Sequence, residues 1–175
     1  MKSTRSRIKL RELIYLSILI ALGIVLNLIE PPISPIPGAK LGLANIVILL
    51  ALLFFGKSEA IIVALLRAIL SAFFKGMLHP IPLFTSMGGS IMAAIAMILV
   101  YDLCRKHFSI VGISIIGGII NNLTQFFIVL YITKNSALWY YLPILLFLGG
   151  ISGWVIGLIT KILYNKMKTV VKNGS

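Results

Sequence analysis

Hydrophobic residues form long, nearly uninterrupted runs in this chain, and polar residues are confined to short segments between the runs. The first run covers residues 9–29 and ends at Glu30, where Pro31 and Pro32 stop a helix because proline lacks a backbone donor. Further runs predict helices at residues 40–55, 60–74, 85–103, 109–133 and 140–164. Several runs reach the roughly 18 to 20 residues that a helix needs to cross a bilayer. The pattern predicts an all-α integral membrane protein of about six transmembrane helices, with residues 1–175 forming a single domain.

The composition supports a membrane protein. Of 175 residues, 59% are hydrophobic and 11% are charged, and the mean hydropathy of +1.08 is far above what a water-soluble domain needs. The basic N-terminus resembles a signal peptide, but no small-residue cleavage site follows it, so we expect it to be retained in the first helix. The single Cys104 excludes an internal disulfide.

Sixteen Lys and Arg residues against four acids give a net charge of +12, and their distribution predicts the orientation in the membrane. With the N-terminus inside, twelve bases lie on the inner face, while the outer face holds only Lys40, Lys75 and Lys134. This asymmetry predicts cytoplasmic termini in the plasma membrane and gives no reason to expect a nucleic-acid partner. Alternatively, the helices at 40–55 and 60–74 form one re-entrant hairpin, which also keeps both ends inside.

Small residues recur at four-residue spacing in three of the predicted helices. The residues are Ala60, Ala64, Ala68 and Ala72 in the third helix, Gly149, Gly153 and Gly157 in the sixth, and Ser17 and Ala21 in the first. Such stripes let helix backbones approach closely in lipid. We expect the third and sixth helices to use them for internal packing, whereas the first could equally meet another protein.

Polar residues inside the predicted spans are costly in hydrocarbon, so they usually face protein or water. Arg67 is the only base well inside a span, and Asn45 and Gln125 belong to other helices. A rise of about 1.5 Å per residue places Asn45 at about 8 Å from the outer surface, Arg67 at about 10 Å, Gln125 at about 12 Å and Asn122 at about 16 Å. Three helices therefore offer polar groups at similar depth in the outer half.

Two interpretations of these residues remain open. In the first, the polar groups form an interhelical hydrogen-bond cluster in which Glu30 or backbone carbonyls satisfy Arg67. In the second, which we favour, Lys40, Asn45, Arg67, Asn122 and Gln125 line a water-accessible pocket for a small anionic or hydroxylated ligand that enters from outside. His79 in the neighbouring loop adds little, because a loop histidine beside a proline is usually just solvated.

The sequence lacks the usual patterns of an enzyme. It has no Walker A motif, no recognisable Ser/His/Asp or Cys/His set, and no clustered carboxylates that could hold Mg²⁺ and a diphosphate. We therefore expect no catalytic residues, no cofactor and no metal. A transporter with this inventory would need its energy from a partner.

Three stretches of the chain resemble a known bacterial family: "PGAKLGLANIVILLALLFFG", "EAIIVALLRAILSAFF" and "FSIVGISIIGGIINNLTQFFIVLY". They resemble the small membrane proteins known both as Gx transporter proteins and as heptaprenyl diphosphate synthase component I. That family is similar in layout to the substrate-binding S components of energy-coupling factor (ECF) vitamin transporters. The resemblance implies six helices, cytoplasmic termini and a ligand pocket near the outer surface.

The resemblance also implies partners. An S component captures its ligand outside and associates with a transmembrane coupling subunit and two ATPases, which here would meet the face of Ser17 and Ala21. S components often present an Ala-x-x-x-Ala face there, and Ser17 makes this match partial. The isoprenoid name implies a different role, a non-catalytic membrane accessory of a heptaprenyl diphosphate synthase. A structural or regulatory protein without a ligand is the third alternative.

Overall fold

The computed structural model describes residues 2–30, 42–76, 80–104 and 108–173. Within these ranges the chain forms six α-helices and one short 3₁₀ helix, and no strand. The elements are α1 (Lys2–Ile29), α2 (Asn45–Phe54), α3 (Lys57–Phe74), α4 (Pro80–Cys104), α5 (Ile110–Thr133), η1 (Ser136–Tyr141) and α6 (Leu142–Asn173). The all-helical class predicted from the hydrophobic runs is therefore confirmed.

Several helices begin at other residues than the pattern predicted. The second helix begins at Asn45 and not near residue 40, because Gly42 has a positive φ of 74° and a turn precedes the helix. The fourth begins five residues earlier than predicted, at Pro80, since proline is tolerated in a first helical turn. The sixth is preceded by η1, in which the backbone N–H of Ala137 donates to Asn135 Oδ1.

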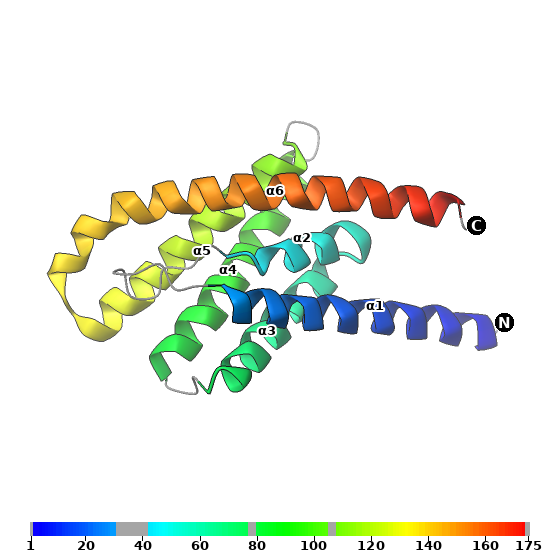
Figure 1. The fold of residues 1–175 in the computed structure, drawn as a ribbon, viewed down its shortest axis with the longest axis horizontal. Helices are drawn as coiled ribbons and strands as arrows, with labels where there is room; N and C mark the ends of the chain where they lie inside the picture. Colours follow the sequence, from blue (N-terminus) through cyan, green and yellow to red (C-terminus); the bar gives the residue numbers. More distant parts are fainter. Residues whose placement is uncertain (1, 31–41, 77–79, 105–107, 174–175) are drawn as a thin grey trace.

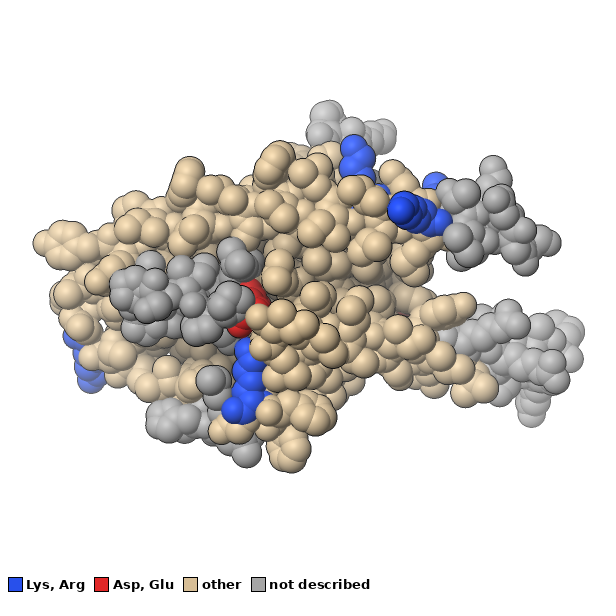
Figure 2. Space-filling model, in the orientation of Figure 1, with Lys and Arg blue, Asp and Glu red and all other residues tan. Residues whose placement is uncertain are grey.

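Within the described ranges, four segments are long and apolar enough to cross a membrane: Glu12–Ile29, Ile81–Leu103, Ile110–Thr133 and Ser136–Lys168. Helices α1 and α6 are the longest, and the two chain ends lie at the same end of the molecule (Figure 1). On the face shown in Figure 2, uncharged residues cover most of the described surface, and basic side chains lie on α6 near the C-terminus. This distribution agrees with helices that face lipid and basic ends outside it.

Helix α2 is the centre of the core. It is buried from Asn45 to Leu52 and contacts each of the other five α-helices (Figure 1). Its ten residues rise about 15 Å, half the thickness of a typical hydrocarbon core. The predicted alanine stripe of α3 is buried beside it, with Ala60, Ala64 and Ala68 fully enclosed. These alanines therefore serve internal packing, as expected.

Helices α5 and α6 pack through glycine. A Cβ atom added at Gly153 would lie 2.6 Å from Ile115 Cα, and one added at Gly118 would lie 2.4 Å from the Gly149 carbonyl oxygen. Real side chains do not approach backbone atoms so closely, so only glycine permits this contact. The glycine stripe predicted to pack internally does so, and it holds α5 in a fixed position beside the rest of the bundle.

Candidate functional site

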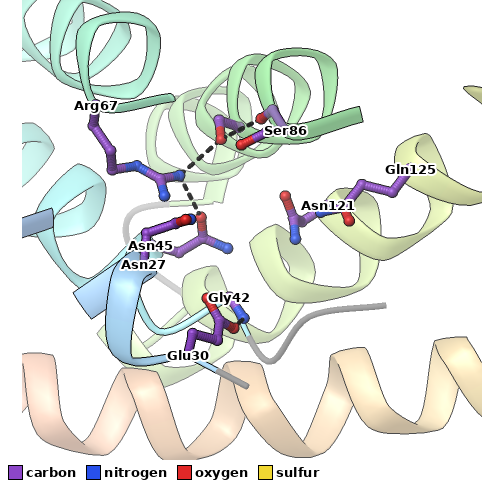
Figure 3. Close-up of a pocket in the computed structure, with 9 residues that line it drawn as sticks. Asn27, Glu30, Gly42, Asn45, Arg67, Ser86, Asn121 and Gln125 are labelled. Atoms are coloured by element: carbon purple, nitrogen blue, oxygen red, sulfur yellow. Dashed lines mark hydrogen bonds between the residues drawn. The ribbon is translucent and has the colours of Figure 1, made fainter. Parts of the chain in front are cut away.

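A buried polar pocket lies where five helices converge (Figure 3). Every residue that lines it is polar or glycine, and every one is buried. The lining residues are Asn27 from α1, Glu30 directly after it, Gly42 before α2, Asn45 from α2, Arg67 from α3, Ser86 and Ser90 from α4, and Asn121 and Gln125 from α5. In a bundle of apolar helices, each buried polar group lowers the stability of the fold unless it is hydrogen-bonded. A convergence of this many polar groups is therefore expected to serve a function.

Arg67 is the cation of the pocket, and only 3% of its surface is exposed. Its Nη2 donates to Ser90 Oγ at 2.8 Å and to Asn45 Oδ1 at 3.3 Å (Figure 3). Its Nε has no hydrogen-bond partner among the described residues. Gly23 of α1 lies against the stem of Arg67, where an added Cβ would be only 2.8 Å from Arg67 Cδ. The guanidinium is thus positioned by three helices and keeps an unused donor.

Glu30 fixes the turn that leads into α2. Its carboxylate accepts hydrogen bonds from the backbone N–H of Gly42 and, at 3.3 Å, from that of Leu43. These contacts join the end of α1 to the start of α2 and thereby place Asn45 at the pocket. Outside the helices, partial burial lowers the pKa of Lys75 from its usual value, and attraction to the Glu30 carboxylate opposes this shift.

Helix α5 contributes two amide side chains, Asn121 and Gln125, one turn apart on the side that faces α4. Gly89 of α4 makes room for both, since a Cβ there would lie 2.7 Å from Asn121 Oδ1 and 2.9 Å from Gln125 Nε2. Gln125 Oε1, although buried, has no hydrogen-bond partner in the described part of the chain, and the same holds for Asn45 Nδ2. The pocket therefore contains unsatisfied donors and acceptors.

The space between these side chains is small. The cavity has a volume of about 10 Å³, which is about what a single water molecule needs. A water here could satisfy some of the unpaired groups, and a larger ligand would require the lining side chains to move apart.

The structure brings Asn45, Arg67 and Gln125 together at the pocket, as the similar predicted depths indicated. Asn122, by contrast, lies on another face of α5, where its Nδ2 donates to the Leu145 carbonyl oxygen of α6 at 3.1 Å. This contact is one between helices, and Asn122 is not among the lining residues. Lys40, like His79, falls outside the described residues.

Sequence reasoning missed part of the lining. It named Glu30 only as an alternative partner of Arg67, and it did not single out Asn27, Ser86 or Ser90. Two local signals were available: Asn27 precedes Glu30 by three residues, and Ser86 precedes Ser90 by four, so each pair shares a helical face. Serine in a membrane helix is a weak signal, because its hydroxyl often bonds its own backbone, as Ser90 Oγ does to Ser86 O at 2.6 Å.

The other predicted site residues lie on the surface. Ser17 and Ala21 are exposed on α1, and Ser17 Oγ donates to the Leu13 carbonyl oxygen within the same helix. Among the described residues, no group of three or more His, Cys, Asp or Glu side chains could hold a metal ion. The chemistry that the pocket offers is hydrogen bonding to a small polar molecule.

A buried polar pocket inside an all-helical membrane bundle defines a membrane protein with a candidate ligand site, and the fold has a close counterpart. The chain is similar to a solved structure described as the S component of a bacterial ECF transporter, with a TM-score of 0.71 and 23% identity over 94% of this chain and 99% of that one. Residues 19–163 match the family described as heptaprenyl diphosphate synthase component I, so the chain belongs to that family. No curated protein matches the sequence.

Proposed function

We propose that the chain is the substrate-binding membrane subunit of an ATP-driven importer of the ECF type. The observation that carries this proposal is the pocket itself, in which five helices direct buried polar groups at one small space. The shared fold supports the proposal, because the similar structure is an S component. The ligand would be a small polar or anionic micronutrient or precursor that enters from the outer side of the plasma membrane.

The energetics of the pocket favour binding over packing as its purpose. A charge near the middle of a bilayer costs at least about 2.5 to 3.5 kcal/mol on insertion scales. Arg67 bears this cost with only two hydrogen bonds, both from Nη2, while Nε has no partner among the described residues. A residue that only joined helices would gain stability by pairing every donor. The unpaired atoms are better explained as groups that a ligand satisfies.

The importer would need partners. With no Walker A motif, this chain does not itself bind ATP in the P-loop manner, so a coupling membrane subunit and two ATPase subunits would supply the energy. Exposed apolar residues surround Ser17 and Ala21 on α1, among them Ile14, Ile18 and Val25. This face is available to a coupling subunit. In this role the chain is a binding protein and not an enzyme.

Mass spectrometry of the protein purified in mild detergent tests the proposal. We expect a bound small molecule, and we expect an ATPase and a coupling subunit to co-purify from native membranes. If the preparation contains neither a small molecule nor these subunits, the importer proposal is wrong.

Arg67→Gln is the sharpest variant for this purpose. It removes the cation and the Nε donor, so we expect the bound molecule to be lost while the folded yield in detergent stays nearly unchanged. Lys161→Gln is the matched control, because Lys161 is an exposed cation on α6, and this variant should retain the molecule. If Arg67→Gln instead unfolds the protein, Arg67 has a packing role.

The family description favours a second candidate function, a non-catalytic accessory of a heptaprenyl diphosphate synthase. Such an accessory would act as a membrane platform for the lipid product, since the described residues of the pocket offer no apolar lining for a prenyl chain. The deciding measurement is synthesis of long-chain prenyl diphosphate in membranes with and without this chain. Unchanged synthesis would remove this candidate.

A further inference from the structure

Two amide nitrogens meet in the pocket beside Gly42. A Cβ atom at this residue would lie 2.9 Å from Asn45 Nδ2 and 3.5 Å from Asn121 Nδ2. The missing side chain therefore lets the Gly42 backbone lie close to two N–H donors from different helices. Asn45 Nδ2 is buried and has no partner within the described ranges, and Figure 3 shows Asn45 and Asn121 facing the same part of the pocket. A ligand oxygen that enters the pocket between these two side chains could accept hydrogen bonds from both amides.

An acceptor lies on the same side of α5. Gln125 is buried, and its Oε1 has no partner among the described residues. Gln125 Nε2 and Asn121 Oδ1 both lie within 2.9 Å of the Cβ position at Gly89, so only glycine leaves room for both amides there. In this arrangement Asn45 Nδ2 is left to donate and Gln125 Oε1 is left to accept among the described residues. A ligand that satisfies the pocket therefore carries a donor as well as an oxygen acceptor.

The charges of the described lining residues cancel. Among them Arg67 contributes one positive charge and Glu30 one negative charge, and the others are four amides, two serines and a glycine. A ligand with a large net charge, such as a diphosphate, would leave that charge poorly compensated in a medium of low dielectric constant. The described part of the lining also contains no aromatic or aliphatic side chain, whereas pockets for larger organic ligands are mostly apolar. Both observations favour a small ligand without net charge.

From these contacts we infer that the pocket binds a small, net-uncharged molecule with a primary amide or ureido group. Its carbonyl oxygen accepts from Asn45 and Asn121 beside Gly42, and its N–H donates to Gln125. The inference rests on the proposed binding function and narrows its ligand from polar or anionic to uncharged. Because the present space fits about one water molecule, the lining side chains part when the ligand enters.

Three molecules of the same shape test the charge and the hydrogen-bonding pattern: acetamide, acetate and acetamidinium. The full chain is purified in mild detergent, dialysed to remove any retained molecule, and its melting temperature is measured as each probe is added. A molecule that binds only the folded state raises the melting temperature in a saturable manner. We expect this response with acetamide and not with acetate or acetamidinium.

Gly42→Ala tests the position of the oxygen, with Gly76→Ala as its control. Both glycines have a positive φ, 74° and 62°, so alanine strains the backbone similarly at each. Among the described residues a Cβ at Gly76 meets nothing within 4 Å, whereas one at Gly42 crowds the side-chain amides of Asn45 and Asn121. We expect Gly42→Ala to lose the acetamide response and Gly76→Ala to keep it.

Gln125→Leu keeps the test valid if Gly42→Ala does not fold. It removes the acceptor without touching the backbone, and loss of one buried hydrogen bond should weaken acetamide binding about tenfold. A larger response to acetate than to acetamide, no response to any probe, or unchanged acetamide binding in Gln125→Leu would overturn the inference. A response to acetate alone would leave the importer proposal intact. Acetamide binding without co-purifying ATPase would support the ligand class and count against the importer.

Discussion

Helix α5 takes part in two very different regions, the pocket on one side and the contact with α6 on the other. Towards α6, glycine residues bring the two backbones together, and the polar Asn122 donates to the Leu145 carbonyl oxygen. Towards the pocket, Gln125 Oε1 remains without a partner among the described residues. One helix thus carries a face whose asparagine is hydrogen-bonded to its neighbour and another whose glutamine leaves Oε1 without a partner among the described residues.

The difference shows how a polar residue that joins two membrane helices can be distinguished from one that is available to a ligand. Asn121 and Asn122 are adjacent, of the same type, and almost equally buried, so neither composition nor burial distinguishes them. What distinguishes them is the surroundings: Asn122 donates to a fixed backbone carbonyl, whereas Asn121 borders a space. In this bundle, unsatisfied polar atoms beside free volume mark the candidate site.

The largest stability loss is expected at the α5–α6 contact. In Gly153→Ala the new Cβ would lie 2.6 Å from Ile115 Cα, so the helices must separate, and we expect the free energy of unfolding to fall by about 2 to 3 kcal/mol. Gly150→Ala is the control one turn away, since its Cβ meets nothing within 4 Å. Reversible unfolding in mixed detergent micelles measures both variants, and equal losses would show that the glycine contact is unimportant.

The adjacent asparagines provide the second comparison. Asn122→Leu removes the bond to α6 and should lower the free energy of unfolding by about 1 kcal/mol, a typical value for hydrogen bonds between membrane helices. Asn121→Leu should leave stability unchanged or slightly higher but abolish retention of the bound molecule. Unfolding and mass spectrometry on the two variants test this, and the reverse assignment of effects would contradict our distinction between the two faces.

Gly23→Ala tests whether the packing of α1 against the side chain of Arg67 keeps the guanidinium in position. The added Cβ would lie 2.7 Å from Val47 Cγ2 and 2.8 Å from Arg67 Cδ. These atoms belong to side chains that can shift, so we expect a stability loss below about 1 kcal/mol but a displaced guanidinium. Retention of the bound molecule should fall while the folded yield does not, and unchanged retention would show that Arg67 does not depend on Gly23.

The smallest effect is expected far from both regions, at the ion pair between Lys57 and Asp102. Their charged atoms are 2.6 Å apart, but the side chains are 57% and 41% exposed. Exposed pairs contribute little, so Lys57→Ala should lower the free energy of unfolding by about 0.5 kcal/mol and leave ligand retention unchanged. A loss as large as that of Gly153→Ala would contradict this ranking.

Much of the fold could be predicted from the sequence. Hydrophobic runs indicate helices that face lipid, and stripes of small residues at four-residue spacing indicate close contacts between helices. The stripes at Ala60–Ala72 and Gly149–Gly157 are internal contacts, as predicted. The first residue of α2 could not be predicted, since it depends on the backbone conformation of Gly42 and on hydrogen bonds that backbone N–H groups donate to the distant Glu30 carboxylate. Such long-range contacts leave no local pattern.

The candidate site was predicted in outline. Depth arguments grouped Asn45, Arg67 and Gln125 correctly, because distance along a helix follows from residue number. They included Asn122, whereas the pocket is lined by Asn121; the two lie at nearly the same depth and differ only in which neighbour each face meets. The rotation of a helix within a bundle is set by its contacts with other helices. Asn27 of α1 and the serines of α4 left only a weak signal in the sequence, a spacing of three or four residues.

The burial of α2 from Asn45 to Leu52 also has a consequence for biogenesis. Helices that cross a bilayer can insert one by one and associate afterwards, because each is stable in lipid on its own. A ten-residue helix that rises about 15 Å cannot match the bilayer alone, and its first turn carries Asn45. It is stable only once its neighbours surround it. We therefore expect α2 to be placed late in assembly, and the pocket to exist only in the finished bundle.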